Sequence, residues 1–162
     1  MLVDVNGEPV MHLDCARVGS AAIVALGVLV LGACSSEPPG PTVAQAEVTL
    51  KADIDWLVKS THAKDVTVTD EGGKDIPCGE GMAKRTYGVA GVDASSVDEP
   101  VIIFNMLTGG LGRRGYKVVS VDWKTPSNES VKGESRVKIT VDSSKKKRFE
   151  LSGETQCLRV AL

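Results

Sequence analysis

An uncharged apolar segment near the N-terminus constrains this chain more than any other feature of its sequence. The segment runs from Ser20 to Ala33 and ends directly before Cys34. At about 14 residues it is shorter than the roughly 20 that a helix needs to cross a bilayer, and it has the length of the apolar core of a secretory signal. The sequence therefore predicts an exported protein whose folded part begins after this segment.

The end of the segment resembles the lipobox of bacterial lipoproteins. An aliphatic residue and two small residues, Leu31, Gly32 and Ala33, come directly before Cys34. The resemblance implies that the thiol of Cys34 carries a diacylglycerol with acyl chains such as palmitate, and that residues 1–33 are removed as a signal peptide. Since each buried methylene contributes about 0.8 kcal/mol, two or three acyl chains would anchor the protein durably. The expected location is the outer face of the cell membrane.

The stretch before the apolar segment departs from an ordinary signal, which begins with positive charge. Here Arg17 is the one basic residue, against three acidic residues. A translation start at Met11 or later would explain the departure, and Cys15 would then belong to the discarded part.

Behind Cys34 the sequence divides into a tether and one domain. Residues 35–45 are rich in Ser, Pro and Gly, which predicts a flexible tether over residues 34–45, including the lipidated cysteine. Residues 46–162 are then expected to form a single extracytoplasmic domain. Periodicity and turn residues predict two helices, from about 46 and from about 99 to Gly115. They predict strands over 65–69, 82–92, 117–123, 136–141, 148–151 and 156–161.

This order of elements predicts an α+β fold, with two helices on one face of a mainly antiparallel sheet. Residues 54–70 and 104–122 both run from a helix with a basic end into an alternating strand that closes on aspartate. An internal αββ–αββ repeat is therefore one interpretation of the sequence. In either case one face of the sheet is expected to be open to water or to a partner.

Two cysteines, Cys78 and Cys157, lie in the domain itself. Neither has a second cysteine at the two-residue spacing of a zinc site or a redox dithiol, so no metal is expected. In an exported domain they are best read as one disulfide. Closing so long a loop contributes about 4 kcal/mol in the chain-entropy treatment.

The residues that suggest chemistry have structural interpretations. The G-x-G-x-x-G string from Gly110 to Gly115 follows a helix and precedes a strand, the reverse of a dinucleotide site, so it predicts a helix end. His62, the only histidine after Cys34, is expected at the surface near a helix end. The basic run 145–148 is expected to be a solvated turn that could touch anionic lipid or wall polymer. Solvated positions are also expected for Asp53, Asp55, Asp70, Glu71 and Asp75.

Composition limits the function further. Without the residues before Cys34 the chain has 18 acidic and 18 basic residues, and its aromatic content is 4%, so nucleic acid is not an expected partner. We expect no catalytic residue, cofactor or metal, and a non-enzymatic accessory or binding module for an envelope protein or polymer. The chain is similar in composition to small uncharacterised surface lipoproteins of actinobacteria. Two alternatives are a carrier of lipid or another small apolar ligand, and a wall hydrolase using His62 or two acids in a cleft.

Replacing the predicted lipidation site tests the anchor. In a Cys34→Ala chain neither lipid attachment nor cleavage before residue 34 can occur, so we expect loss of the membrane-bound form of wild-type size and a larger, uncleaved chain in its place, measured by fractionation and immunoblotting. Cys15→Ala is the matched control and should behave as the wild-type chain. A Cys34→Ala chain that stays membrane-bound at wild-type size would refute the anchor.

Overall fold

The computed structural model describes residues 40–94 and 99–161. The apolar segment, the lipobox with Cys34 and residues 35–39 of the predicted tether lie outside these residues. Among the described helices, none is both long enough and apolar enough to cross a membrane.

Helix α1 (Val43–Ser60) begins three residues before the predicted boundary of the domain at Ala46. A capping box sets the start, because the Thr42 hydroxyl accepts from the backbone N–H of Gln45 while the Gln45 side chain accepts from the backbone N–H of Thr42. The end of the predicted tether is therefore helical. The buried apolar face of α1 consists of Val43, Ala46, Leu50, Ile54 and Leu57.

Helix α2 (Pro100–Arg113) starts and ends as its sequence predicts. Pro100 occupies the first turn, where its missing N–H removes no hydrogen bond. At the other end Gly115 has a φ of 84°, its N–H donates to Gly112, and the N–H of Tyr116 donates to the carbonyl of Leu111. This pair of bonds is a Schellman motif, so the string from Gly110 to Gly115 is a helix end as expected.

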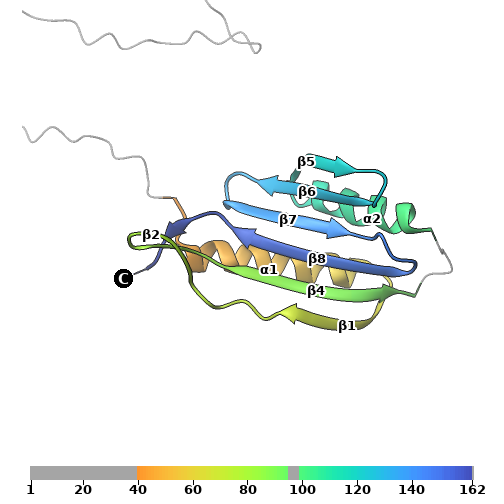
Figure 1. The fold of residues 1–162 in the computed structure, drawn as a ribbon, viewed down its shortest axis with the longest axis horizontal. Helices are drawn as coiled ribbons and strands as arrows, with labels where there is room; N and C mark the ends of the chain where they lie inside the picture. The colour runs from red at the N-terminus through yellow and green to blue at the C-terminus, as the bar shows by residue number, and fades with distance from the viewer. Residues whose placement is uncertain (1–39, 95–98, 162) are drawn as a thin grey trace, which may run out of the picture. The chain divides into compact units, whose positions relative to one another are not determined.

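A six-stranded sheet forms the body of the domain, and both helices lie behind it in Figure 1. In spatial order its strands are β1 (Ala63–Asp70), β4 (Thr86–Asp93), β8 (Arg148–Thr155), β7 (Val137–Asp142), β6 (Ser127–Lys132) and β5 (Lys117–Asp122). Every pair of neighbours is antiparallel. The predicted α+β fold is confirmed.

The two helix–strand–strand units occupy opposite flanks of this sheet. Helix α1 leads into edge strand β1 and then β4, while α2 leads into the other edge strand β5 and then β6. The β7–β8 hairpin fills the space between them. This is the arrangement expected of a repeated αββ unit with a hairpin added at the centre.

Strand β6 (Ser127–Lys132) was not predicted. Its residues facing the helices, Asn128 and Ser130, are polar yet buried, so the strand lacks the alternation of apolar residues that reveals a half-buried strand. The Asn128 amide donates to the hydroxyl of Thr108 on α2, and Ser130 donates to Asn128. These bonds satisfy the polar groups that burial removes from water.

A small second sheet consists of β2 (Ile76–Gly79), β3 (Met82–Lys84) and β9 (Leu158–Arg159). The strand predicted over 82–92 is thus divided at Arg85, where the chain passes from the small sheet to the large one, and the last predicted strand shrinks to two residues. The Cys78–Cys157 disulfide is present, with Cα atoms 5.9 Å apart. It ties β2 to the segment that leads into β9, which confirms the predicted pairing.

The core lies between the helices and the large sheet, and a glycine allows α1 to approach. A Cβ atom at Gly153 of β8 would lie well inside contact distance of Leu50 on α1, and 2.9 Å from the carbonyl oxygen of Lys138. Neither neighbour can move freely, because Leu50 is fully buried and the carbonyl belongs to β7.

Adding one methyl group at this contact tests the packing. We expect Gly153→Ala to lower the free energy of unfolding by about 2 kcal/mol through overpacking, as measured by chemical denaturation. Gly133→Ala is the matched control, since a Cβ there meets nothing within 4 Å, and its effect should stay within about 0.5 kcal/mol. Equal stabilities of the two variants would contradict this account of the contact.

Candidate functional site

The face of the large sheet that turns away from the helices is the most open surface of the domain. The alternate residues Val89, Leu151 and Val141 are buried toward the helices. Their strand neighbours point to the other side, and pairing places four of them in one row across β1, β4, β8 and β7. The row consists of Thr67, Ala90, Glu150 and Asp142.

A hollow of about 400 Å³ lies over this row. We call it the groove and define it by Thr67, Ala90, Asp142, Lys145, Arg148 and Glu150. Its floor is low because Thr67 and Ala90 have small side chains, whereas longer charged side chains surround them. Strand order brings these residues together, since β4 and β8 are neighbours in the sheet but distant in sequence.

Charges of both signs line the groove. Lys145 and Arg148 come from the basic turn between β7 and β8, and the acids are Asp142, Glu150 and Asp65. Asp65 has a φ of 49° and lies where β1 loses register with β4, so the edge strand is irregular at the rim. The basic run is indeed an exposed turn, but part of it also belongs to this hollow.

A second hollow of about 240 Å³ lies further along the same face. Lys138 on its wall binds Glu154 at 2.9 Å, and Lys84 binds the same carboxylate at 3.0 Å. The hydrogen bond from Lys138 lowers the pKa of Glu154 although partial burial opposes it. The charges of this second hollow are therefore already paired with one another. Among the described residues, neither Lys145 nor Arg148 of the groove forms a side-chain ion pair.

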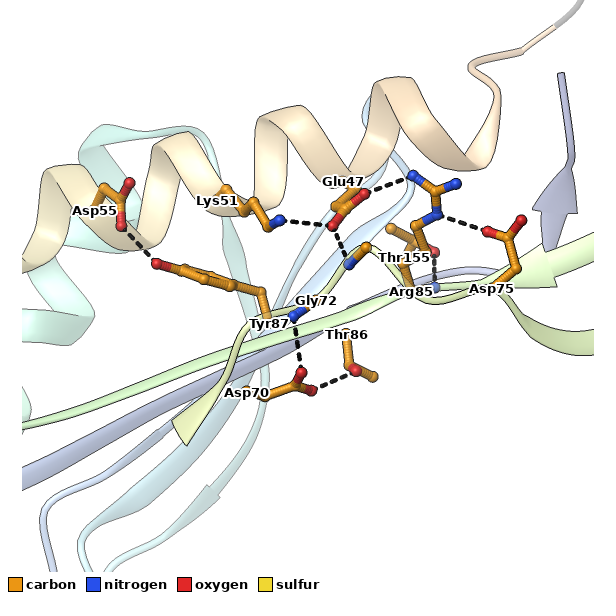
Figure 2. Close-up of polar contacts among 11 residues, drawn as sticks. Glu47, Lys51, Asp55, Asp70, Gly72, Asp75, Arg85, Thr86, Tyr87 and Thr155 are labelled. Atoms are coloured by element: carbon orange, nitrogen blue, oxygen red, sulfur yellow. Dashed lines mark hydrogen bonds and ion pairs between the residues drawn. The ribbon is translucent and has the colours of Figure 1, made fainter. Parts of the chain in front are cut away.

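A different polar cluster, which we call the Glu47 network, fixes the loop between β1 and β2 to helix α1 (Figure 2). The Glu47 carboxylate accepts from Lys51 at 2.9 Å, from Arg85 at 2.7 Å and from the backbone N–H of Gly73 at 2.6 Å. Burial raises the pKa of Glu47, but these three donors together lower it below its ordinary value. Arg85 also donates to Asp75 at 2.6 Å, so the network holds the loop in place.

Most of the acids expected to be solvated are bound to the protein. Asp70 accepts from the backbone N–H of Gly72 at 2.9 Å and from the hydroxyl of Thr86, as Figure 2 shows. Asp55 accepts from the phenol of Tyr87 at 3.0 Å. Burial raises the pKa of that phenol, and the hydrogen bond to Asp55 raises it further. Asp70 and Asp75 are nevertheless exposed as predicted, whereas the prediction of solvation is wrong for Asp55, which is half-buried.

The prediction is also wrong for Asp53, whose side chain is 0% exposed. Its carboxylate accepts from Arg114 Nε at 2.7 Å, from the Tyr116 phenol at 3.0 Å and from Lys132 Nζ at 3.2 Å. Burial raises the pKa of Tyr116, and Asp53 raises it further, so the phenol keeps the proton that it donates. We call these four residues the Asp53 cluster.

The sequence contained a signal for this cluster. Asp53 follows Leu50 by three residues and precedes Leu57 by four, so it lies on the buried apolar face of α1. A charged residue in that position needs a partner of opposite sign. The partners could not be identified from the sequence, because they lie beyond the end of α2 and on the unpredicted strand β6.

His62 lies at the surface behind the end of α1, as predicted. Its carbonyl accepts from the backbone N–H of Ala94 at 2.9 Å, and it does not line the groove. Within residues 40–94 and 99–161 no group of three or more His, Cys, Asp or Glu side chains could hold a metal ion.

Two adjacent arginines provide a test of the Asp53 cluster. Arg114→Ala removes one cation from a fully buried carboxylate, and we expect a loss of about 3 kcal/mol in the free energy of unfolding, because Lys132 and Tyr116 remain. Arg113→Ala is the matched control, since Arg113 lies over the ring of Trp56, 5.9 Å from its centroid, and forms no ion pair with the described residues. That contact is worth about 0.5–1 kcal/mol. Equal losses in thermal or chemical denaturation would show that Asp53 does not need Arg114.

Comparison with known proteins gives no relative from which a function could be transferred. No protein-family model, no curated protein and no solved structure matches this chain.

Proposed function

We propose that this protein is a lipid-anchored surface module that binds another component of the cell envelope through the groove. The supporting observation is the hollow of about 400 Å³ on the open face of the sheet, lined by charges of both signs. The resemblance of Leu31–Cys34 to a lipobox supports the outer face of the cell membrane as the location.

The lining indicates what kind of ligand fits. Lys145 and Arg148 offer cations to carboxylate or phosphate groups, and the arginine can form two parallel bonds to either. Asp142 and Glu150 accept hydrogen bonds from amines and amides on the same ligand. An extended polar chain carrying both kinds of group, such as an envelope peptide or a wall polymer, matches this surface.

The two alternative functions have less support. A carrier of an apolar ligand needs a cavity of several hundred cubic ångströms, which in this fold would lie in the layer between helices and sheet. That layer is occupied by fully buried side chains such as Leu50, Phe104 and Leu107. A wall hydrolase would have to use His62, which is exposed and away from the groove, or two acids in a cleft. Asp142 and Glu150 are such a pair in the groove, and both are exposed.

Site-specific photocrosslinking tests the proposal on the full chain in the intact envelope. A photoreactive residue at Glu150, inside the groove, should give a discrete crosslinked product, because a bound ligand lies against this position. The same residue at Glu134, an exposed glutamate outside the groove, is the matched control and should not. The readout is a mobility shift on denaturing gels, followed by mass spectrometry of the product.

A charge reversal then connects the product with the groove. Arg148→Glu should reduce the crosslinked product severalfold, whereas Lys124→Glu, an exposed position elsewhere, should leave it unchanged. Products of equal yield at Glu150 and Glu134, or no product at either, would count against the groove as the binding site. If Cys34 proves not to carry lipid, the same crosslinking experiment still tests whether the groove binds a ligand.

A further inference from the structure

Edge strand β5 (Lys117–Asp122) is exposed along its whole length. Within the described residues it pairs with β6 alone, so one row of its backbone donors and acceptors faces solvent. Its side chains are apolar for such a position, since Val118, Val119 and Val121 are 45%, 57% and 38% exposed. Trp123 follows the strand, 66% exposed, with its ring 5.6 Å from that of Phe104 on α2.

The opposite edge of the sheet is different. Strand β1 loses register with β4 at two places, and Asp65 within it has a left-handed conformation. Such irregularities are a common means of preventing an edge from pairing with another chain. Strand β5 has one irregularity, between Val118 and Ser120. It is thus the more regular and the more apolar of the two edges.

The residues of β5 are complementary to themselves when the strand is turned around. In an antiparallel pair of two such strands, Lys117 can lie opposite Asp122 of the second copy, and Val118 opposite Val121. Two-fold symmetry makes each of these pairs occur twice. The single irregularity lies near the centre of the strand, between Val118 and Ser120, so the Lys117 and Asp122 positions at the two ends lie outside it.

We propose that β5 is the surface on which a second copy of this chain docks, by antiparallel pairing of β5 with β5. Backbone hydrogen bonds and the exposed valines provide the attraction. The Lys117–Asp122 pairs are at the surface and contribute little energy, but they select the register, because a shift of one residue places Lys117 opposite a valine.

The turn that follows β5 holds the Asp122 side chain in position for the pair with Lys117. Its carboxylate accepts from the hydroxyl of Thr125 at 2.6 Å and from the backbone N–H of Lys124 at 2.9 Å. These bonds hold the carboxylate at the end of the strand. The hydrogen bond from Thr125 lowers the pKa of Asp122 below its ordinary value.

Engineered cysteines test the register in the full chain. Val119 and Ser120 of the two copies lie opposite each other in this pairing, at Cα separations of about 4.5–5.5 Å that suit a disulfide. Differently tagged Val119→Cys and Ser120→Cys chains, expressed together, should give a mixed disulfide-linked dimer on non-reducing gels, in at least tenfold higher yield than either chain alone. A Val66→Cys and Thr67→Cys pair on β1 is the matched control. A yield no higher than that control would overturn the proposal.

Charge exchange provides a second, independent measurement. Lys117→Asp places two aspartates opposite each other at both ends, and Asp122→Lys does the same with lysines, so self-association of each full-length variant should weaken at least tenfold. A mixture of the two variants restores both attractive pairs and should associate as the wild-type chain does, measured by energy transfer between labelled chains. Asp122→Lys also loses the hydrogen bonds of the turn, so circular dichroism checks that this variant remains folded. If the Asp122→Lys variant does not fold, the Lys117→Asp variant alone decides the outcome. Unchanged self-association of Lys117→Asp would falsify the pairing.

Discussion

The buried carboxylate of Asp53 is the contact on which the arrangement of the domain depends. It joins α1 of the first αββ unit to three donors of the second, namely Arg114 and Tyr116 behind α2 and Lys132 on β6. Apolar packing is tolerant of sliding, whereas a buried charge is stable only where its partners converge. The cluster therefore fixes how the two units lie on a common core, and with them the order of strands that creates the groove.

Structural polar groups and exposed polar groups are separated in this domain. The Asp53 cluster and the Glu47 network lie on the helix side of the sheet or at its end, where their donors and acceptors satisfy one another. The disulfide secures the small sheet in a similar way. Lys145 and Arg148 of the groove form no side-chain ion pair among the described residues, so their charges are available to a ligand.

The sequence predicted those elements whose information is local. The start of α2 at Pro100, the turn at Gly115 and the disulfide follow from proline and glycine conformation and the number of cysteines, and all three are present. The capping box at Thr42, which starts α1 inside the predicted tether, was missed. Strand β6 and the burial of Asp53 were missed, because each depends on a partner distant in sequence, such as Thr108 for Asn128. The groove was visible only as a basic turn, since its other walls come from strands that meet through the order β1-β4-β8-β7.

The two proposed surfaces have a geometric relation to each other. Antiparallel pairing of two β5 strands continues the sheet across a two-fold axis that runs perpendicular to it, so the open faces of both copies point to the same side. Two grooves would then be presented together to one extended ligand. Because the second contact becomes intramolecular, a repetitive wall polymer or peptide would be held with an avidity about 10²–10⁴ times the affinity of one groove. A shallow, solvent-exposed site of modest affinity is then sufficient for firm attachment.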